Sequence, residues 1–129
     1  MPRIAIAAVL VTSALLIAGC GGDKADPQVV KGQDTQAKAD ARNMVSEVEL
    51  CYVENQDYSS CRKPPGTKLP LGSAKGQVEV TKATADGYTI VAHSKSGNTF
   101  TIAKTGTGPL KRTCDAAGSE EGACKGGTW

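Results

Sequence analysis

The hydrophobic pattern of the chain changes its period once, and this change is the strongest constraint on the fold. Across residues 34–55 apolar side chains recur every three or four positions, which places them on one face of a helix. After residue 76 the period becomes two, in segments at 77–83, 87–93, 98–104 and 109–114 that short turn sequences separate. Because short turns require antiparallel pairing, the sequence predicts an α+β fold: one amphipathic helix packed on an antiparallel β-meander of three to four strands.

The core of this fold is expected to combine the helical stripe with strand positions of one parity. Asp34 is expected to cap the helix, because its carboxylate can accept amide hydrogens of the first turn. Asp40 and the other polar helix residues are expected to face water, and Trp129 is expected to dock on the sheet edge. The predicted core packing residues are Met44, Val48, Tyr52, Tyr58, Val80, Ile90, Phe100 and Ile102.

Four cysteines form two close pairs, Cys51 with Cys61 and Cys114 with Cys124, each with nine residues between its members. An even number of cysteines in a small exported domain is typical of a disulfide framework. Four cysteines allow three connectivities, and the short gaps favour the two local bridges. The spacing contains no C-x-x-C, and the one histidine, His93, lies far from these cysteines in sequence, so we expect neither a metal nor a redox site.

The N-terminal segment predicts export and lipid attachment. Arg3 precedes an apolar run at 4–19, which at about 16 residues is shorter than the ~20 that a membrane-spanning helix needs. The string LIAGC at 16–20 resembles a bacterial lipobox, which implies cleavage between Gly19 and Cys20 and acylation of the Cys20 sulfur. We expect a signal peptide at 1–19, lipidated Cys20 and a flexible tether at 20–33, and one domain at 34–129 outside the cytoplasm, anchored to the bacterial cell membrane.

Composition and motif spacing argue against several function classes. A formal charge of +2 over 129 residues, with five aromatic residues and no basic run, does not predict nucleic-acid binding. His93 is expected to be a strand surface residue, since no serine or cysteine stands at motif spacing to be activated by it. Asp115, Glu120 and Glu121 lack the spacing of a calcium loop. We therefore expect no enzyme activity, no cofactor and no small-molecule substrate.

At 48–61 the string VELCYVENQDYSSC places Tyr52, Asn55 and Tyr58 in a short polar stretch after the helical stripe. This string resembles the helix end of type IV pilins and type II secretion pseudopilins. The segment GYTIVAHSKSGNTFTI at 87–102 is similar to their paired strands, and the segment 114–124 to their disulfide-closed C-terminal loop. The resemblance implies a pilin-like domain. Pilins polymerise through an apolar N-terminal half-helix that follows a Gly-Phe type cleavage site, and this chain has no such site.

Three functions agree with these patterns. The leading hypothesis is a non-enzymatic, lipid-anchored cell-envelope protein with a pilin-like domain that is structural or binds another macromolecule, such as a second envelope protein. The first alternative is a minor subunit of a type IV pilus or pseudopilus that retains the apolar segment 4–19. The second alternative is a small secreted binding or inhibitor module that uses the proline-rich loop at 62–71.

Overall fold

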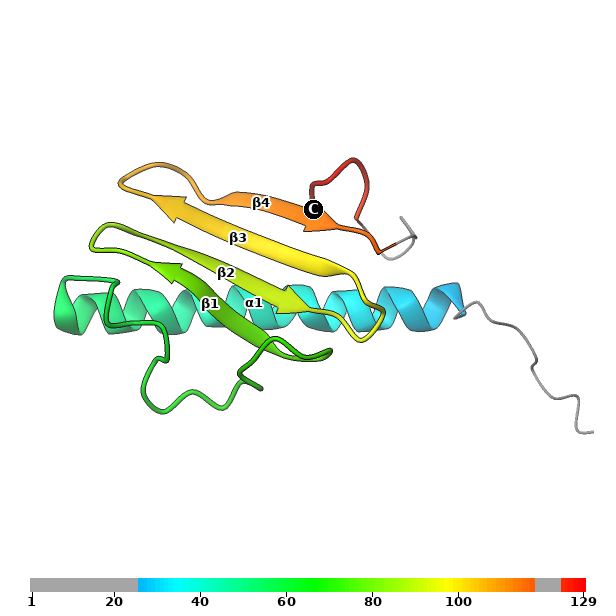
Figure 1. Cartoon of the computed structure of the whole chain (residues 1–129), viewed down its shortest axis with the longest axis horizontal. Helices are drawn as coiled ribbons and strands as arrows, with labels where there is room; N and C mark the ends of the chain where they lie inside the picture. Colours follow the sequence, from blue (N-terminus) through cyan, green and yellow to red (C-terminus); the bar gives the residue numbers. More distant parts are fainter. Residues whose placement is uncertain (1–25, 118–123) are drawn as a thin grey trace, which may run out of the picture.

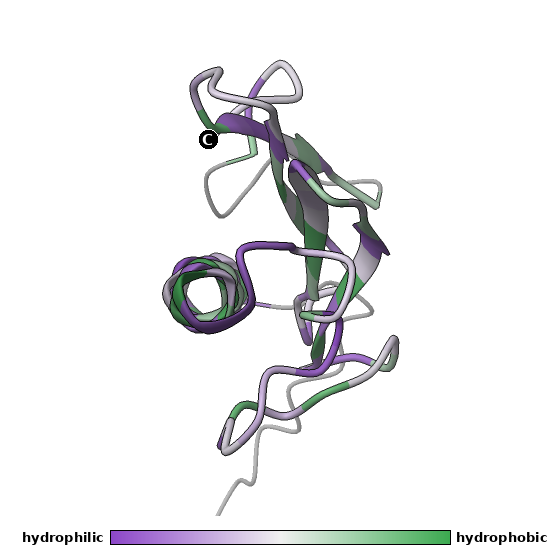
Figure 2. Cartoon of the chain, turned by 90° about the vertical axis from the view of Figure 1, so that its left-hand side faces the viewer, coloured by the Kyte–Doolittle hydropathy of each residue, from purple (hydrophilic) through white to green (hydrophobic). Residues whose placement is uncertain are grey.

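The computed structural model describes residues 26–117 and 124–129, which form one helix and one sheet. The helix α1 spans Pro27–Asn55, and the strands are β1 Val78–Ala83, β2 Gly87–His93, β3 Thr99–Thr105 and β4 Lys111–Asp115. The strands are antiparallel and lie in the order β1-β2-β3-β4. The helix runs along one face of the sheet (Figure 1), and the view along its axis shows the two layers (Figure 2). The predicted α+β architecture is confirmed, with four strands.

The start of α1 differs from the prediction, because its N-cap is Asp26, eight residues before Asp34. The Asp26 carboxylate accepts a hydrogen bond from the Gln28 N–H at 2.8 Å, and Pro27 supplies a backbone angle suited to the first turn. Residues 27–33, which were expected to belong to the flexible tether, are therefore helical. Asp34 lies inside the helix and does not cap it.

The helix α1 ends where the sequence predicts. The chain then turns back toward the sheet. Gln56 adopts a left-handed conformation with φ of 56°, and its N–H donates to the Tyr52 carbonyl at 2.6 Å. The following loop runs back to β1, where the Val78 N–H donates to the Pro70 carbonyl at 2.9 Å. This loop therefore extends the hydrogen bonding of the sheet beyond β1.

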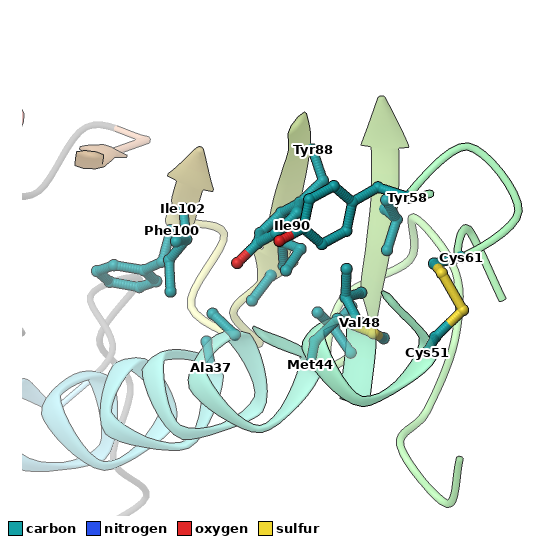
Figure 3. Close-up of a cluster of buried hydrophobic side chains, with 14 of the residues drawn as sticks. Ala37, Met44, Val48, Cys51, Tyr58, Cys61, Tyr88, Ile90, Phe100 and Ile102 are labelled. Carbon is teal, nitrogen blue, oxygen red and sulfur yellow. A yellow bond between two sulfur atoms is a disulfide. The ribbon is translucent and has the colours of Figure 1, made fainter. Parts of the chain in front are cut away.

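The core lies between one stripe of α1 and the inner face of the sheet, mainly over β2 and β3. In Figure 3 the side chains of Met44 and Val48 point from the helix toward Ile90 on β2. Tyr52 differs from the other predicted core residues because it is only partly buried, where it stacks on Tyr58 with ring centroids 4.2 Å apart. The predicted core residues that the structure buries are Met44, Val48, Tyr58, Val80, Ile90, Phe100 and Ile102.

The helix covers only one face of the sheet, so each layer also has an outer side. On the outer face of the sheet the threonines of β2 and β3 are partly exposed, in agreement with the predicted alternation. On the side of α1 away from the sheet, Leu50 and Val53 are 63% and 67% exposed. The main apolar cluster of the described residues therefore lies at the interface between α1 and the sheet.

We expect Met44→Ala to destabilise the domain by about 2–5 kcal/mol, because Met44 is fully buried and its truncation leaves a cavity. Leu50→Ala, on the same helix but exposed, is the matched control and should change the free energy of unfolding by less than about 0.5 kcal/mol. Urea unfolding followed by circular dichroism measures both. Equal effects of the two substitutions would contradict the observed orientation of α1.

Candidate functional site

Near the C-terminal end of α1, the carboxylate of Glu49 accepts three hydrogen bonds. Tyr88 Oη and Lys104 Nζ donate to its Oε1 at 2.9 and 2.8 Å, and Tyr58 Oη donates to its Oε2 at 2.8 Å. Lys104 Nζ also donates to the Tyr58 oxygen at 2.7 Å and lies 5.2 Å from the Tyr58 ring centroid. These four residues, the Glu49 cluster, connect α1, the loop that follows it, β2 and β3.

The contacts in the Glu49 cluster shift the ionisation of its members. Burial opposes the charge of Glu49, but the hydrogen bonds from Lys104, Tyr58 and Tyr88 outweigh it and hold the pKa below its usual value. The hydrogen bond to Glu49, followed by that to Tyr58, raises the pKa of Lys104. Burial raises the pKa of Tyr58 and Tyr88, and the adjacent Glu49 carboxylate adds to this effect. At neutral pH the cluster is thus one ion pair flanked by two neutral phenols.

A second carboxylate, that of Asp34, is fully buried in the N-terminal half of α1. Its Oδ1 accepts hydrogen bonds from Ser94 Oγ and Ser96 Oγ, each at 2.6 Å, and its Oδ2 accepts one from Asn98 Nδ2 at 2.8 Å. All three donors belong to the β2–β3 hairpin around its turn. The Asp34 cluster, formed by these four residues, therefore fastens the helix to that turn.

A pocket of about 360 Å³ opens beside the Asp34 cluster, between α1, the loop before β1 and the end of β2. Asp40 lines it with a carboxylate that accepts from Gln36 Nε2 at 2.9 Å, and this residue is only 7% exposed instead of facing water as predicted. The lining is mainly apolar by area and also includes one acid, two amides and two basic side chains. The lining residues are Gly32, Gln33, Gln36, Ala37, Asp40, Pro70, Gly76, His93, Ser94 and Lys95.

His93 ends β2 at the rim of this pocket and is partly buried. Its Nε2 lies 3.0 Å from Oε1 of Glu79 on β1. The prediction of a strand surface residue agrees with this position, since the imidazole lies beside a carboxylate of the neighbouring strand. Within residues 26–117 and 124–129, no group of three or more His, Cys, Asp or Glu side chains is arranged to hold a metal ion.

Both predicted disulfide bonds are present. Cys51 on α1 is bonded to Cys61 in the following loop, with Cα atoms 5.9 Å apart. Cys114 on β4 is bonded to Cys124, with Cα atoms 5.7 Å apart. Each bridge closes a short local loop, in agreement with the spacing in the sequence.

Trp129 is docked on the sheet edge, as predicted. Its indole Nε1 donates to the Thr113 carbonyl on β4 at 2.9 Å, and its ring meets that of Phe100 edge-on with centroids 5.6 Å apart. Three cationic side chains also surround this ring, from Lys38, Arg42 and Arg112. No local sequence pattern predicts this group, because its members come from α1, β4 and the C-terminal segment.

Several predicted positions lie outside the described residues, namely Gly19, Cys20, Glu120 and Glu121. The observed roles of Asp34, Asp40 and Glu49 were not predicted from the sequence. For Asp34 a signal was present, since it stands four positions after Val30 and three before Ala37, on the buried stripe itself. An acidic residue at that spacing indicates a buried carboxylate with dedicated donors.

Comparison with known proteins adds no further assignment, because no protein family, curated protein or solved structure matches this chain. Among the residues that the structure describes, no helix is both long enough and apolar enough to cross a membrane.

Replacement of Asp34 by alanine should destabilise the domain by at least about 2 kcal/mol, because it leaves buried donors of Ser94 and Asn98 without their acceptor. Thr35→Ala, at the adjacent exposed position, is the control and should have an effect below about 1 kcal/mol. Chemical denaturation of both variants measures the difference. A stability of Asp34→Ala close to wild type would show that these hydrogen bonds add nothing to the fold.

Glu49→Gln should change how stability depends on pH. Because the folded pKa of Glu49 lies below its unfolded value of 4.5, its contribution is complete above that pH and is lost as the pH falls through the folded pKa. The pair with Lys104 is partly exposed, so the contribution is about 1 kcal/mol or less. Urea unfolding at a series of pH values from neutral to acidic should show a shallower acid loss in Glu49→Gln, but not in the exposed control Glu54→Gln.

Proposed function

We propose that this chain is a non-enzymatic, lipid-anchored protein of the bacterial cell envelope whose domain binds another macromolecule there. The observation that carries this proposal is the start of α1 at Pro27, with only residues 21–26 between the helix and Cys20 of the lipobox-like string. The seven steps from Cys20 to Pro27 span at most about 25 Å, so an acylated Cys20 would hold the domain close to the membrane surface. The two disulfide bonds are consistent with a location outside the cytoplasm.

Two carboxylates, the buried Asp34 and the partly exposed Glu49, support a structural role for the polar clusters. Asp34 and Glu49 each accept three hydrogen bonds from side chains of the same fold. Such carboxylates hold elements together, whereas a general base needs a lone pair directed at a substrate proton. This arrangement favours a binding or structural protein over an enzyme.

The pocket beside α1 supplies the surface through which a partner would bind. Its volume of about 360 Å³ accommodates a few side chains of a macromolecular partner. Asp40 on one wall and Lys95 on the other offer charges of both signs. Because the rest of the lining is mainly apolar, the partner we propose is an envelope protein that presents a segment with both apolar and charged side chains.

The resemblance to pilins supports a second candidate, a minor subunit of a pilus or pseudopilus. The specific observation in its favour is the exposure of Leu50 and Val53 on the side of α1 away from the sheet, where the helix of a second copy could pack. This candidate requires that the mature protein retain the apolar segment 4–19. The two candidates therefore differ in the N-terminus of the mature chain.

Mass spectrometry of the N-terminal peptide from the membrane fraction of bacteria that express the full chain tests the anchor. We expect a peptide that begins at Cys20 and carries the added mass of a diacylglyceryl group. Cys20→Ala should abolish both the modification and the cleavage, because no other side chain near the cleavage position offers a thiol. A mature protein that retains segment 4–19 with unmodified Cys20 would overturn the proposal and favour the pilus subunit.

A further inference from the structure

Three cationic side chains from distant parts of the sequence meet at the ring of Trp129. Arg42 on α1 has its Cζ 5.1 Å from the ring centroid, Arg112 on β4 has its Cζ at 5.4 Å, and Lys38 on α1 has its Nζ at 5.5 Å. The indole is held in place by its hydrogen bond to Thr113. These four side chains, Lys38, Arg42, Arg112 and Trp129, form the basic corner between α1 and β4.

The two arginines of the basic corner are exposed and belong to neither ion pair seen among the described residues. Within residues 26–117 and 124–129, the two ion pairs are Glu79 with His93 and Glu49 with Lys104, and neither includes an arginine of the corner. Arg42 and Arg112 are both exposed. Burial, followed by repulsion from Arg42, lowers the pKa of Lys38, and the Asp34 carboxylate acts in the opposite direction. An anion at the corner would interact favourably with Arg42 and Arg112.

We propose that the basic corner binds the anionic phospholipid headgroups of the membrane that carries the protein. The corner combines arginines with a tryptophan, which is the residue combination favoured at membrane–water interfaces. Leu110, two positions before Arg112, is 41% exposed and offers an apolar side chain beside these charges. A basic and aromatic edge of this kind matches a negatively charged lipid surface.

The closeness of the domain to the membrane rests on the proposed lipid anchor. Residues 21–26 allow at most about 25 Å between Cys20 and the start of α1. The described C-terminal segment lies over the middle of α1, beside β4, and so on one long edge of the molecule (Figure 1). A domain on so short a tether meets headgroups at a high effective concentration, so modest electrostatic attraction suffices to dock that edge.

The single tryptophan of the chain makes the docking measurable. The mature full chain is reconstituted in vesicles that contain a dansyl-labelled lipid, and energy transfer from Trp129 to dansyl is recorded. We expect higher transfer in vesicles with phosphatidylglycerol than in pure phosphatidylcholine, and a return to the phosphatidylcholine value at high salt. Arg42→Gln/Arg112→Gln should remove the difference, while Arg42→Lys/Arg112→Lys should keep most of it. The control Arg62→Gln/Lys63→Gln, with the same change of charge at exposed positions outside the corner, should behave like wild type.

If mass spectrometry finds no lipid on Cys20, the same protein is added from outside to sucrose-loaded vesicles and the sedimented fraction is measured. Here the Arg42→Gln/Arg112→Gln variant should bind phosphatidylglycerol vesicles about thirty-fold more weakly, since each basic side chain near an anionic surface contributes about five-fold. This assay tests the corner independently of the anchor. Equal signals in the two lipid compositions, or equal signals for the variant and wild type, would overturn the proposal.

The sequence also places Glu120 and Glu121 between Cys114 and Cys124. Glu120→Gln/Glu121→Gln therefore tests whether carboxylates of the chain itself occupy the corner. We expect this variant to retain the lipid dependence of wild type. Lipid dependence that is present only in this variant would show an intramolecular ion pair in place of a lipid site and would contradict the proposal.

Discussion

The packing of one stripe of α1 on the inner face of the sheet is the contact on which the rest of the structure depends. Among residues 26–117 and 124–129 one helix covers the sheet, and the burial of Met44, Val48, Ile90 and Phe100 occurs at that interface. A domain this small has little apolar surface to bury, and covalent links help to offset the entropy of ordering the chain. The disulfide between Cys51 and Cys61 acts at the end of this helix, where the chain turns back toward the sheet.

The Asp34 cluster and the Glu49 cluster fix the position of α1 along the sheet. Asp34 and Glu49 stand 15 residues apart on α1, about 22 Å along the helix axis. The first is fastened to the β2–β3 turn through Ser94, and the second to β3 through Lys104. A helix displaced by one turn would keep much of its apolar burial but would leave these buried polar groups without partners, at a cost that apolar contacts do not impose. The clusters thereby select one placement of the helix.

The sequence predicted those parts of the fold that a local pattern determines. Alternating apolar and polar residues with short turns between them predicted β2 and β3, and the helical stripe predicted the end of α1 at Asn55. The short spacing of Cys114 and Cys124 predicted their disulfide bond. Three predictions near the start of the helix were wrong. Polar composition suggested a flexible tether through residue 33, Asp34 was expected to cap the helix, and Asp40 was expected to face water. The spacing of Asp34 on the helical stripe indicates burial, but its donors lie 60 to 64 positions away, so no local pattern identifies them. The basic corner was missed for the same reason.

The two binding surfaces that we infer lie on opposite sides of α1. The pocket is lined by Gly76 and Pro70, which precede β1, whereas the basic corner lies toward β4 at the other edge of the sheet. Docking of the corner on the membrane would therefore leave the pocket directed away from the lipid, where an envelope partner can reach it. Because α1 is continuous from Pro27 to the Glu49 cluster, the short tether and the corner together would fix the orientation in which the pocket is presented.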